Sequence, residues 1–439
     1  MGSYLPNTEA EQRDMLREAG YDSFDALFSS IPASVRLSRP LDLPAGISEL
    51  EARAAMEDMA AGNVRFRHVF RGAGAYSHYI PAIVKSIVAK ETFLTAYTPY
   101  QAEISQGVLQ SIFEYQTMIS EVTGMAASNA SLYDGATATA EAAAMCRDRK
   151  RSAVCISAAV NPETIDTVRT YCFGSGAAFR LVPEKDGVKD AAALAGALGD
   201  DAACLILQQP NFYGNLEDAH ALGEAAHAAG AKFVMSVYPM SLPLLETPAD
   251  CGADVCVGEG QPLGMPLSFG GPYLGFMAAT DAMTRKLPGR IVGETTDHEG
   301  RRAFVLTLQA REQHIRREKA SSNVCSNEAL CAMTAAAYLS AMGPSGLREA
   351  AEQCVSKAHY LADALSSAGL ALKYDAEFFN EFVTTSRVPA SDILDALEAR
   401  GILGGLALND HDILWCATEC NAKAEMDAAA AAVKEVTGK

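Results

Sequence analysis

Short apolar runs alternate with amphipathic segments through the middle of the chain. Each apolar run has the length of a buried β-strand, and each intervening segment has the apolar spacing and end signals of an α-helix. The predicted strands cover 153–157, 177–182, 203–209, 232–239, 253–258 and 273–279. The predicted helices cover 108–124, 134–149, 161–176, 189–199 and 217–230. This alternation predicts an α/β fold with a mostly parallel sheet and helices on both faces.

The two ends of the chain have different patterns. The first forty-five residues predict two helices, the first capped by Asn7 or Thr8, and a proline-rich linker, with another capped helix from about residue 47. After a charged connection, a helix at 328–343 leads into a helix, strand, helix, strand, helix series. We therefore predict an N-terminal helical arm at 1–60, a large domain at 61–330 and a small C-terminal domain at 331–439.

Composition narrows the class of protein. The chain has 439 residues, 49% of them hydrophobic and 21% charged, with a formal net charge of −18. A soluble globular protein fits these values, and the negative charge argues against nucleic acid or an anionic membrane as the main partner. The eleven cysteines include no C-x-x-C pair, so we expect no metal site and a reducing, cytoplasmic setting.

Two glycine clusters could indicate a dinucleotide site. They are "GAGAYS" at 72–77 and "GSGAAF" at 174–179, and neither completes G-x-G-x-x-G. The first follows a charged helix end, and the second caps a helix before a strand. A nicotinamide cofactor would need such a turn between a strand and a helix, so we do not expect one.

The helix start at "LYDGATATAEAAA" has the features of an anion site. Gly135 and Thr137 would offer free N–H groups and a hydroxyl at the positive end of a helix dipole. An ordinary helix capped by Asp134 explains the same residues equally well. Both interpretations stay open at this point.

Aromatic and polar residues gather in "AYSHY" at 75–79 and "TAYTPYQAEISQG" at 95–107. Phenol hydroxyls, an imidazole and amides this close would suit a wall that orients a small polar substrate. A surface loop with hydrogen-bonded tyrosines is the alternative.

A basic stretch lies within 308–330. Its charged residues include Arg311, His314, Arg317 and Lys319, and a helix here would place 311, 314 and 318 on one face. A docking or anion-binding edge is one interpretation, and a solvated basic helix is the other.

The loop "VGEGQPLGMPLSFGGP" at 257–272 lacks an expected lysine. In a large class of cofactor enzymes the end of this strand carries the lysine that binds pyridoxal phosphate (PLP), but Glu259, Gln261 and Ser268 occupy the candidate positions. No lysine lies between Lys232 and Lys286, and Lys232 begins its strand, far from the carboxyl edge of the sheet. A Schiff base needs an amine, so this loop cannot form one. The strand at 232–239 also carries Tyr238 where an acid would normally pair with the pyridine nitrogen.

Long stretches of the chain resemble one family, the split glycine decarboxylase (P-protein) of the glycine cleavage system. Within that family they resemble the alpha subunit, which lacks the lysine that binds PLP. The matching segments are "YLPNTEAEQRDML", "TAYTPYQAEISQG", "NASLYDGATATAEA", "QPLGMPLSFGGPYLGFMA", "FFNEFV" and most of 287–330. The resemblance implies a fold-type I PLP-dependent transferase (aspartate aminotransferase-like) large domain with a smaller α+β C-terminal domain. It also accounts for the missing lysine, since the homologous beta half carries it.

The resemblance implies a function shared between two chains. With glycine dehydrogenase subunit 2 (beta), which would bind the PLP, the assembly would decarboxylate glycine and pass the aminomethyl group to the lipoylated H-protein. We expect a cytoplasmic heterotetramer in which Tyr76, His78, Thr98 and Tyr100 of this chain complete the site. An autonomous PLP-dependent aminotransferase or lyase, a purely structural paralogue and an unrelated binding protein on the same fold are the alternatives.

Overall fold

The chain divides by its contacts into two units, Met1–Val64 and Arg65–Lys439. The structure is a computed structural model, and it describes residues 6–37, 39, 41–94, 98–189, 191–271, 273–320 and 322–438. The contact boundary falls after Val64, four residues beyond the predicted end of the arm. The division of the second unit at residue 330 stays a prediction.

The first unit consists of three helices whose starts follow the predicted capping pattern. They are α1 (Glu9–Glu18), α2 (Phe24–Leu27) and α3 (Glu49–Ala61). Thr8 caps α1 and Ser48 caps α3, each in a capping box with the glutamate three residues on. No described residue of this unit is buried, so local capping and not a core of its own defines these helices.

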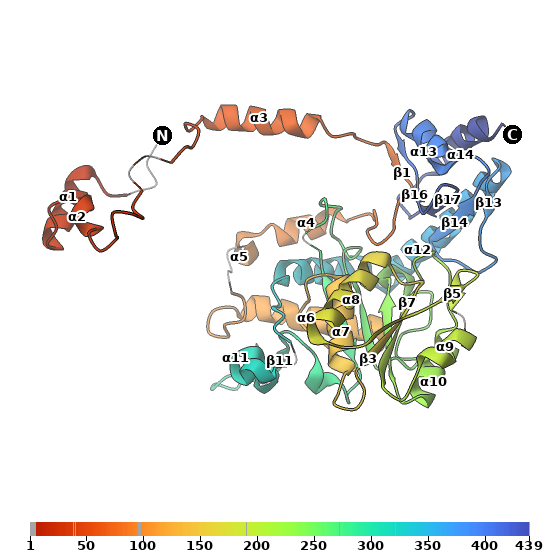
Figure 1. Ribbon diagram of the computed structural model, residues 1–439, viewed down its shortest axis with the longest axis horizontal. Helices are drawn as coiled ribbons and strands as arrows, with labels where there is room; N and C mark the ends of the chain where they lie inside the picture. The colour runs from red at the N-terminus through yellow and green to blue at the C-terminus, as the bar shows by residue number, and fades with distance from the viewer. Residues whose placement is uncertain are drawn as a thin grey trace. The chain divides into compact units, whose positions relative to one another are not determined.

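A seven-stranded sheet forms the centre of the second unit (Figure 1). Its strand order is β2-β10-β9-β8-β7-β3-β4, with β9 to β4 parallel and β10 antiparallel to both of its neighbours. The strands are β2 (Ala127–Ser128), β10 (Gly275–Ala279), β9 (Val255–Glu259), β8 (Lys232–Val237), β7 (Ala202–Gln209), β3 (Ala153–Ser157) and β4 (Phe179–Val182). The mostly parallel sheet predicted from the alternating pattern is confirmed.

Helices cover both faces of this sheet, because successive side chains of a strand point to opposite faces. On β7, Cys204 and Ile206 pack in one buried cluster with α7 and α8, whereas Leu205 and Leu207 pack in another with α6, α10 and α12. The helices of this unit are α4 (Ala82–Val88), α5 (Glu91–Leu94), α6 (Gln106–Thr123), α7 (Gly135–Cys146), α8 (Pro162–Ser175), α9 (Ala191–Ala197), α10 (Ala219–Ala228), α11 (Gln313–Arg316), α12 (Ala329–Ser367), α13 (Ala390–Glu398) and α14 (Lys423–Thr437).

The C-terminal part has a four-stranded antiparallel sheet in the order β13-β14-β17-β16. Its strands are β13 (Ala371–Leu372), β14 (Glu381–Thr385), β17 (Asp412–Cys416) and β16 (Leu406–Ala407). α13, α14 and the second half of α12 pack on it around the buried Trp415. The two helices predicted on either side of residue 343 are joined in α12 across a kink at Gly343 and Pro344.

Three smaller pairings complete the described fold. β1 (His68–Val69) pairs with β15 (Ile402–Leu403), β5 (Glu184–Lys185) with β6 (Val188–Lys189), and β11 (Val292–Thr296) with β12 (Arg302–Leu306). The hairpin of β11 and β12 lies where the sequence predicted only a charged connection. Its strands carry exposed charges such as the paired Glu294 and Arg302, so no apolar alternation marked them. Among the described helices, none is long and apolar enough to cross a membrane.

Candidate functional site

A cavity of about 460 Å³ lies at the carboxyl edge of the large sheet. This is the edge at which ligands bind in open α/β sheets. Its walls come from the ends of β7, β8 and β9, the first turns of α7 and α8, and two loops. The lining residues are Gly72–Tyr76, Asp134–Ala136, Asn161, Glu163, Thr164, Gln208, Ser236–Tyr238, Glu259, Gly270 and Tyr273.

The Glu259 carboxylate occupies the helix start that faces this cavity. It accepts hydrogen bonds from the backbone N–H of Gly135 (3.0 Å), Gln261 (2.9 Å) and Leu274 (3.0 Å). A Cβ on Gly135 would lie 2.9 Å from the Glu259 backbone nitrogen, so only glycine lets α7 begin this close to β9. Burial raises the pKa of Glu259 to about 7, against the opposing effect of these three N–H groups.

The predicted anion site at Gly135 and Thr137 therefore has partners within the chain. The Thr137 N–H donates to the Asp134 carboxylate (2.7 Å), which also caps the helix. The Gly135 N–H donates to Glu259. The structure thus corresponds to the alternative interpretation, an ordinary capped helix, with the chain's own carboxylate in place of an external anion.

The described residues around this cavity do not fit PLP. No lysine or arginine is among those that line it, whereas Asp134, Glu163 and Glu259 are. The lysine-free position is filled by Gln261, which is buried and bonds both the N–H and the carbonyl of Tyr76. Lys232 lies at the opposite end of β8, where its ammonium group donates to Asp254 (2.8 Å). A cofactor with a phosphate would meet neither an amine nor a free set of N–H groups here.

Residues 72–80, called here the 72–80 segment, link this cavity to the small sheet. The Tyr76 hydroxyl donates to Glu381 on β14 (2.7 Å), and the Tyr76 ring packs 4.4 Å from the Tyr238 ring, centroid to centroid. The other Glu381 oxygen accepts the Ala73 N–H (2.6 Å). Because the Glu381 carboxylate is fully enclosed, burial raises its pKa to about 7.

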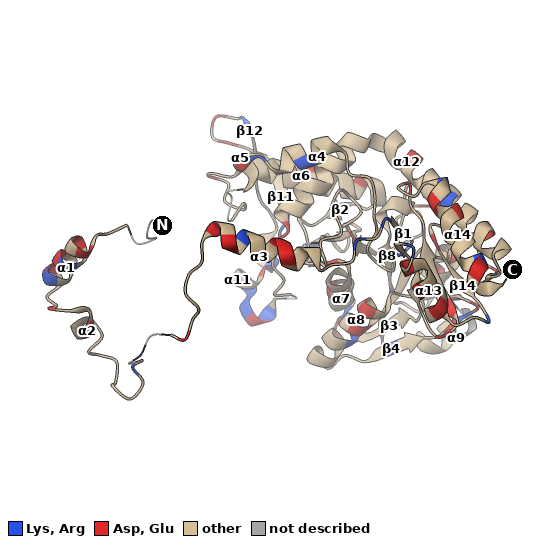
Figure 2. Cartoon of the chain, turned by 90° about the horizontal axis from the view of Figure 1, so that it is seen from above, with Lys and Arg blue, Asp and Glu red and all other residues tan. Residues whose placement is uncertain are grey.

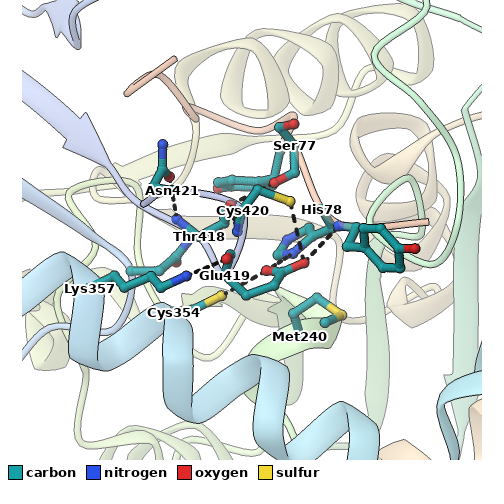
Figure 3. A network of polar contacts seen from close by, with 12 residues as sticks. Ser77, His78, Met240, Cys354, Lys357, Thr418, Glu419, Cys420 and Asn421 are labelled. Atoms are coloured by element: carbon teal, nitrogen blue, oxygen red, sulfur yellow. Dashed lines mark hydrogen bonds and ion pairs between the residues drawn. The ribbon is translucent and has the colours of Figure 1, made fainter. Parts of the chain in front are cut away.

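His78 makes the second link from this segment (Figure 3). Its Nδ1 lies 2.7 Å from a carboxylate oxygen of Glu419, in the turn after β17, and its Nε2 contacts the Tyr238 hydroxyl. The other Glu419 oxygen accepts the Tyr79 N–H (2.7 Å). Burial by itself would raise the pKa of Glu419, but the hydrogen bond and charge of His78, together with backbone N–H groups such as that of Tyr79, outweigh it and hold that pKa below its usual value.

The four residues predicted to complete the site fall into two groups. Tyr76 and His78 are buried beside Tyr238, with their polar atoms bonded inside the chain. Tyr100 is half-buried and donates its hydroxyl to the Ser326 carbonyl, and Thr98 is exposed. Tyr97, the remaining tyrosine of that loop, lies outside the described residues.

The basic stretch does not form a continuous helix, which would have been needed to place residues 311, 314 and 318 on one face. α11 covers only Gln313–Arg316, short 3₁₀ turns flank it, and Arg317 adopts a positive φ of 52°. The Arg311 guanidinium turns inward and donates to the carbonyls of Leu287 and Gly289 (2.8 Å to the latter). His314, Arg317 and Lys319 remain exposed. Figure 2 shows the lysine and arginine positions beside α11 as blue ribbon. Arg311 is therefore not available for docking.

Two acids that organise this region were missed from the sequence. Glu381 is the one charged residue in β14, whose sequence is "EFVTT", and a lone acid in a buried strand was a signal for an internal partner. Glu419 follows the apolar strand β17 in "ATECN", with no such local signal. Both contact the 72–80 segment although they lie more than 300 residues from it in the sequence.

We expect the stability of the protein to depend on pH through Glu381. Its pKa is about 7 when folded against an ordinary 4.5, so its contribution is fully present below about pH 4.5 and is lost as the pH rises through 7. Relative to Glu381→Gln, the wild type should lose on the order of 2–3 kcal/mol of unfolding free energy between pH 5 and 8. Urea unfolding at several pH values measures this difference.

The matched control is Glu377→Gln, at an exposed position just before the same strand. It should leave the pH dependence of the wild type unchanged. An identical pH dependence for Glu381→Gln and the wild type would contradict the expected burial of an ionisable carboxyl at Glu381.

Comparison with known proteins gives a consistent family assignment. A family model described as glycine cleavage system P-protein matches residues 2–432. A curated relative from Moorella thermoacetica, named probable glycine dehydrogenase (decarboxylating) subunit 1, is 47% identical over 442 residues, 99% of each chain. A crystal structure of glycine decarboxylase (P-protein) of the glycine cleavage system, in inhibitor-bound form, is 43% identical, with a TM-score of 0.93 over 99% of this chain and 100% of that one.

A more distant structure supports the fold alone. The alanine–glyoxylate aminotransferase from Nostoc sp. is 17% identical, with a TM-score of 0.59 over 92% of this chain and 98% of that one. The predicted aminotransferase-like α/β fold is confirmed by this match together with the P-protein structure. With one family model spanning almost all of its length, this chain belongs to the glycine cleavage system P-protein family.

Proposed function

We propose that this chain is the subunit of a heteromeric glycine decarboxylase that lacks the PLP-binding lysine. With glycine dehydrogenase subunit 2 (beta) it would decarboxylate glycine, release CO2 and pass the aminomethyl group to the lipoyl arm of the H-protein. The observation that carries the proposal is a family match along the chain combined with a cavity that offers no amine and no free N–H cradle. In this proposal the chain completes a site whose cofactor its partner holds.

The partner supplies the PLP in this account, and PLP supplies the electron sink for decarboxylation when bound. The residues of this chain contribute by binding, orienting and enclosing. In this chain Glu259 and Gln261 bond backbone groups beside the cavity, where a cofactor-binding subunit would need groups for its ligand.

Two different roles follow from the two groups of predicted site residues. Thr98 and Tyr100 lie on a partly exposed loop, so they are our choice for the wall that faces the partner's cofactor and orients the glycine carboxylate. Tyr76 and His78 are buried and already bonded, so we assign them a positioning role. They would act by holding the two sheets in one arrangement around the shared site.

Removal of the Tyr100 hydroxyl should impair the assembled enzyme. The hydroxyl bonds the Ser326 carbonyl, and its loss removes one hydrogen bond that fixes the loop. For Tyr100→Phe we expect kcat/KM for glycine to fall about 3- to 10-fold, the effect of roughly 1 kcal/mol. The measurement is glycine-dependent CO2 release by the enzyme assembled with its beta subunit and lipoylated H-protein.

The matched control is Tyr360→Phe, which removes a tyrosine hydroxyl bonded to Asp427 on the C-terminal helices. It should leave turnover at the wild-type level. If Tyr100→Phe and His78→Ala both assemble and turn over glycine normally, this chain is a structural paralogue that touches no substrate.

The exposed part of the basic stretch is our proposed docking surface for the H-protein. It consists of His314, Arg317 and Lys319, on a chain whose net charge is −18. An acidic carrier would be repelled by most of this surface and attracted by a local basic patch.

The double substitution Arg317→Ala and Lys319→Ala should weaken that encounter. We expect KM for the H-protein to rise about 3- to 10-fold at low salt with kcat for saturating carrier unchanged, and the difference to shrink as salt screens the charges. Steady-state kinetics at two ionic strengths measure it. Arg348→Ala, an exposed arginine on α12, is the control, and an equal rise in KM for both variants would exclude a specific docking role.

A further inference from the structure

Two groups of side chains in the described part of the chain could hold a metal ion. One is His220, Glu246 and Cys251, in which the histidine and the glutamate are exposed and pair with each other at the surface. The other is His78, Cys354 and Glu419, whose ligand atoms all lie within 4.8 Å of one another in the interior. Only the second has the enclosed setting of a built site.

A second thiol, that of Cys420, stands beside the buried group (Figure 3), although it is not one of the three whose ligand atoms lie within 4.8 Å of one another. The Cys420 thiol lies 3.8 Å from one Glu419 oxygen, and the Cys354 thiol lies 3.3 Å from the other. The imidazole Nδ1 of His78 approaches the same carboxylate at 2.7 Å. The four residues come from the 72–80 segment, from α12 and from the turn after β17.

The spacing is close to that of a tetrahedral zinc site. With zinc bonds of about 2.0–2.2 Å to nitrogen or oxygen and 2.3 Å to sulfur, neighbouring ligand atoms lie roughly 3.3–3.8 Å apart. The distance from the Cys354 sulfur to its Glu419 oxygen is within this range, and the Cys420 sulfur lies 3.8 Å from the other Glu419 oxygen. To surround one ion, the gap between His78 and Glu419 would have to open by about 0.6 Å, and the Cys420 thiol would have to turn toward the other three donors.

The orientation of His78 is the one that a metal-bound imidazole has. Its Nδ1 faces the sulfur and carboxylate donors, while its Nε2 is held by the Tyr238 hydroxyl on the far side of the ring. A hydrogen bond to the second ring nitrogen is the usual outer support of a zinc-binding histidine. Tyr238 itself is buried, so that support is fixed by packing.

Charge and access also suit a divalent cation. Zinc with one carboxylate, two thiolates and a neutral imidazole carries a net charge of −1, and Lys357, whose ammonium group contacts the Glu419 carbonyl, offers the balancing charge. Cys354 is buried, but Cys420 is exposed and gives the ion a route from solvent. Without metal, the same groups bond one another.

We propose that His78, Cys354, Glu419 and Cys420 form a zinc site that adjoins the cavity through Tyr238. On binding, Zn²⁺ would replace the thiol protons of Cys354 and Cys420, which leave to solvent, and no oxidation or reduction takes place. The ion would connect α12, the 72–80 segment and the turn after β17 at one point. The sequence could not indicate this site, because its histidine and its cysteines lie hundreds of residues apart.

Cobalt substitution tests the proposal on the reduced, chelator-treated full chain without an affinity tag. Titration with Co²⁺ should give one equivalent of binding with a near-ultraviolet thiolate-to-cobalt absorption band, and Zn²⁺ should abolish that band. Cys354→Ser and Cys420→Ser should each weaken Co²⁺ binding by about 10-fold or more. At the same zinc concentration, the thermal unfolding midpoint of the wild type should rise more than that of Cys420→Ser.

Two control variants identify the site. His220→Ala removes the surface group, and Cys325→Ser removes an exposed thiol elsewhere, so both should keep the band. Cys420→Ser keeps the test decisive if the buried Cys354→Ser fails to fold. Absence of a thiolate band in the wild type, an unchanged Co²⁺ affinity in Cys420→Ser, or loss of the band in His220→Ala would overturn the proposal.

Discussion

A carboxylate held inside the protein determines what the cavity at the carboxyl edge of the sheet can do. Glu259 accepts three backbone N–H groups, one of them at the start of α7, in a place where burial disfavours its charge. Because the carboxylate of Glu259 already occupies the positive end of the α7 dipole, that helix start does not attract a second anion. With Gln261 bonded to Tyr76, the neighbouring wall is also complete. The cavity keeps the form of a cofactor site without the groups that would hold a cofactor.

Residues beside the cavity also position the 72–80 segment. Gln261 and Tyr238 contact this segment from the large sheet, while Glu381 and Glu419 contact it from the C-terminal part. Because these contacts bury several polar groups that satisfy one another, loss of one partner would leave a buried group unpaired. The segment therefore links both sheets through hydrogen bonds within the chain. A subunit specialised to support a partner can use those residues for rigidity.

The sequence predicts some of this organisation better than the rest. The apolar strands and the capped helices follow from local signals, such as Thr8, Ser48 and the alternating residues of β7, and the absence of a lysine between Lys232 and Lys286 is a fact of the sequence. The family resemblance accounts for that absence, since it implies that the partner chain carries the PLP lysine. The position of Glu259 against Gly135 joins residues 124 apart, so no local pattern contains it. The continuous helix expected around Arg311 was wrong because basic spacing alone ignored the inward hydrogen bonds of that arginine.

The most direct test of the central claim is borohydride reduction in the presence of PLP, followed by intact mass and peptide mapping. It should be done on this chain alone and after assembly with its lysine-bearing partner. The account predicts that stoichiometric label appears only on a lysine of the partner, because the cavity at Glu259 offers PLP no amine. Stoichiometric label on one lysine of this chain would contradict the account and make the chain a PLP enzyme in its own right.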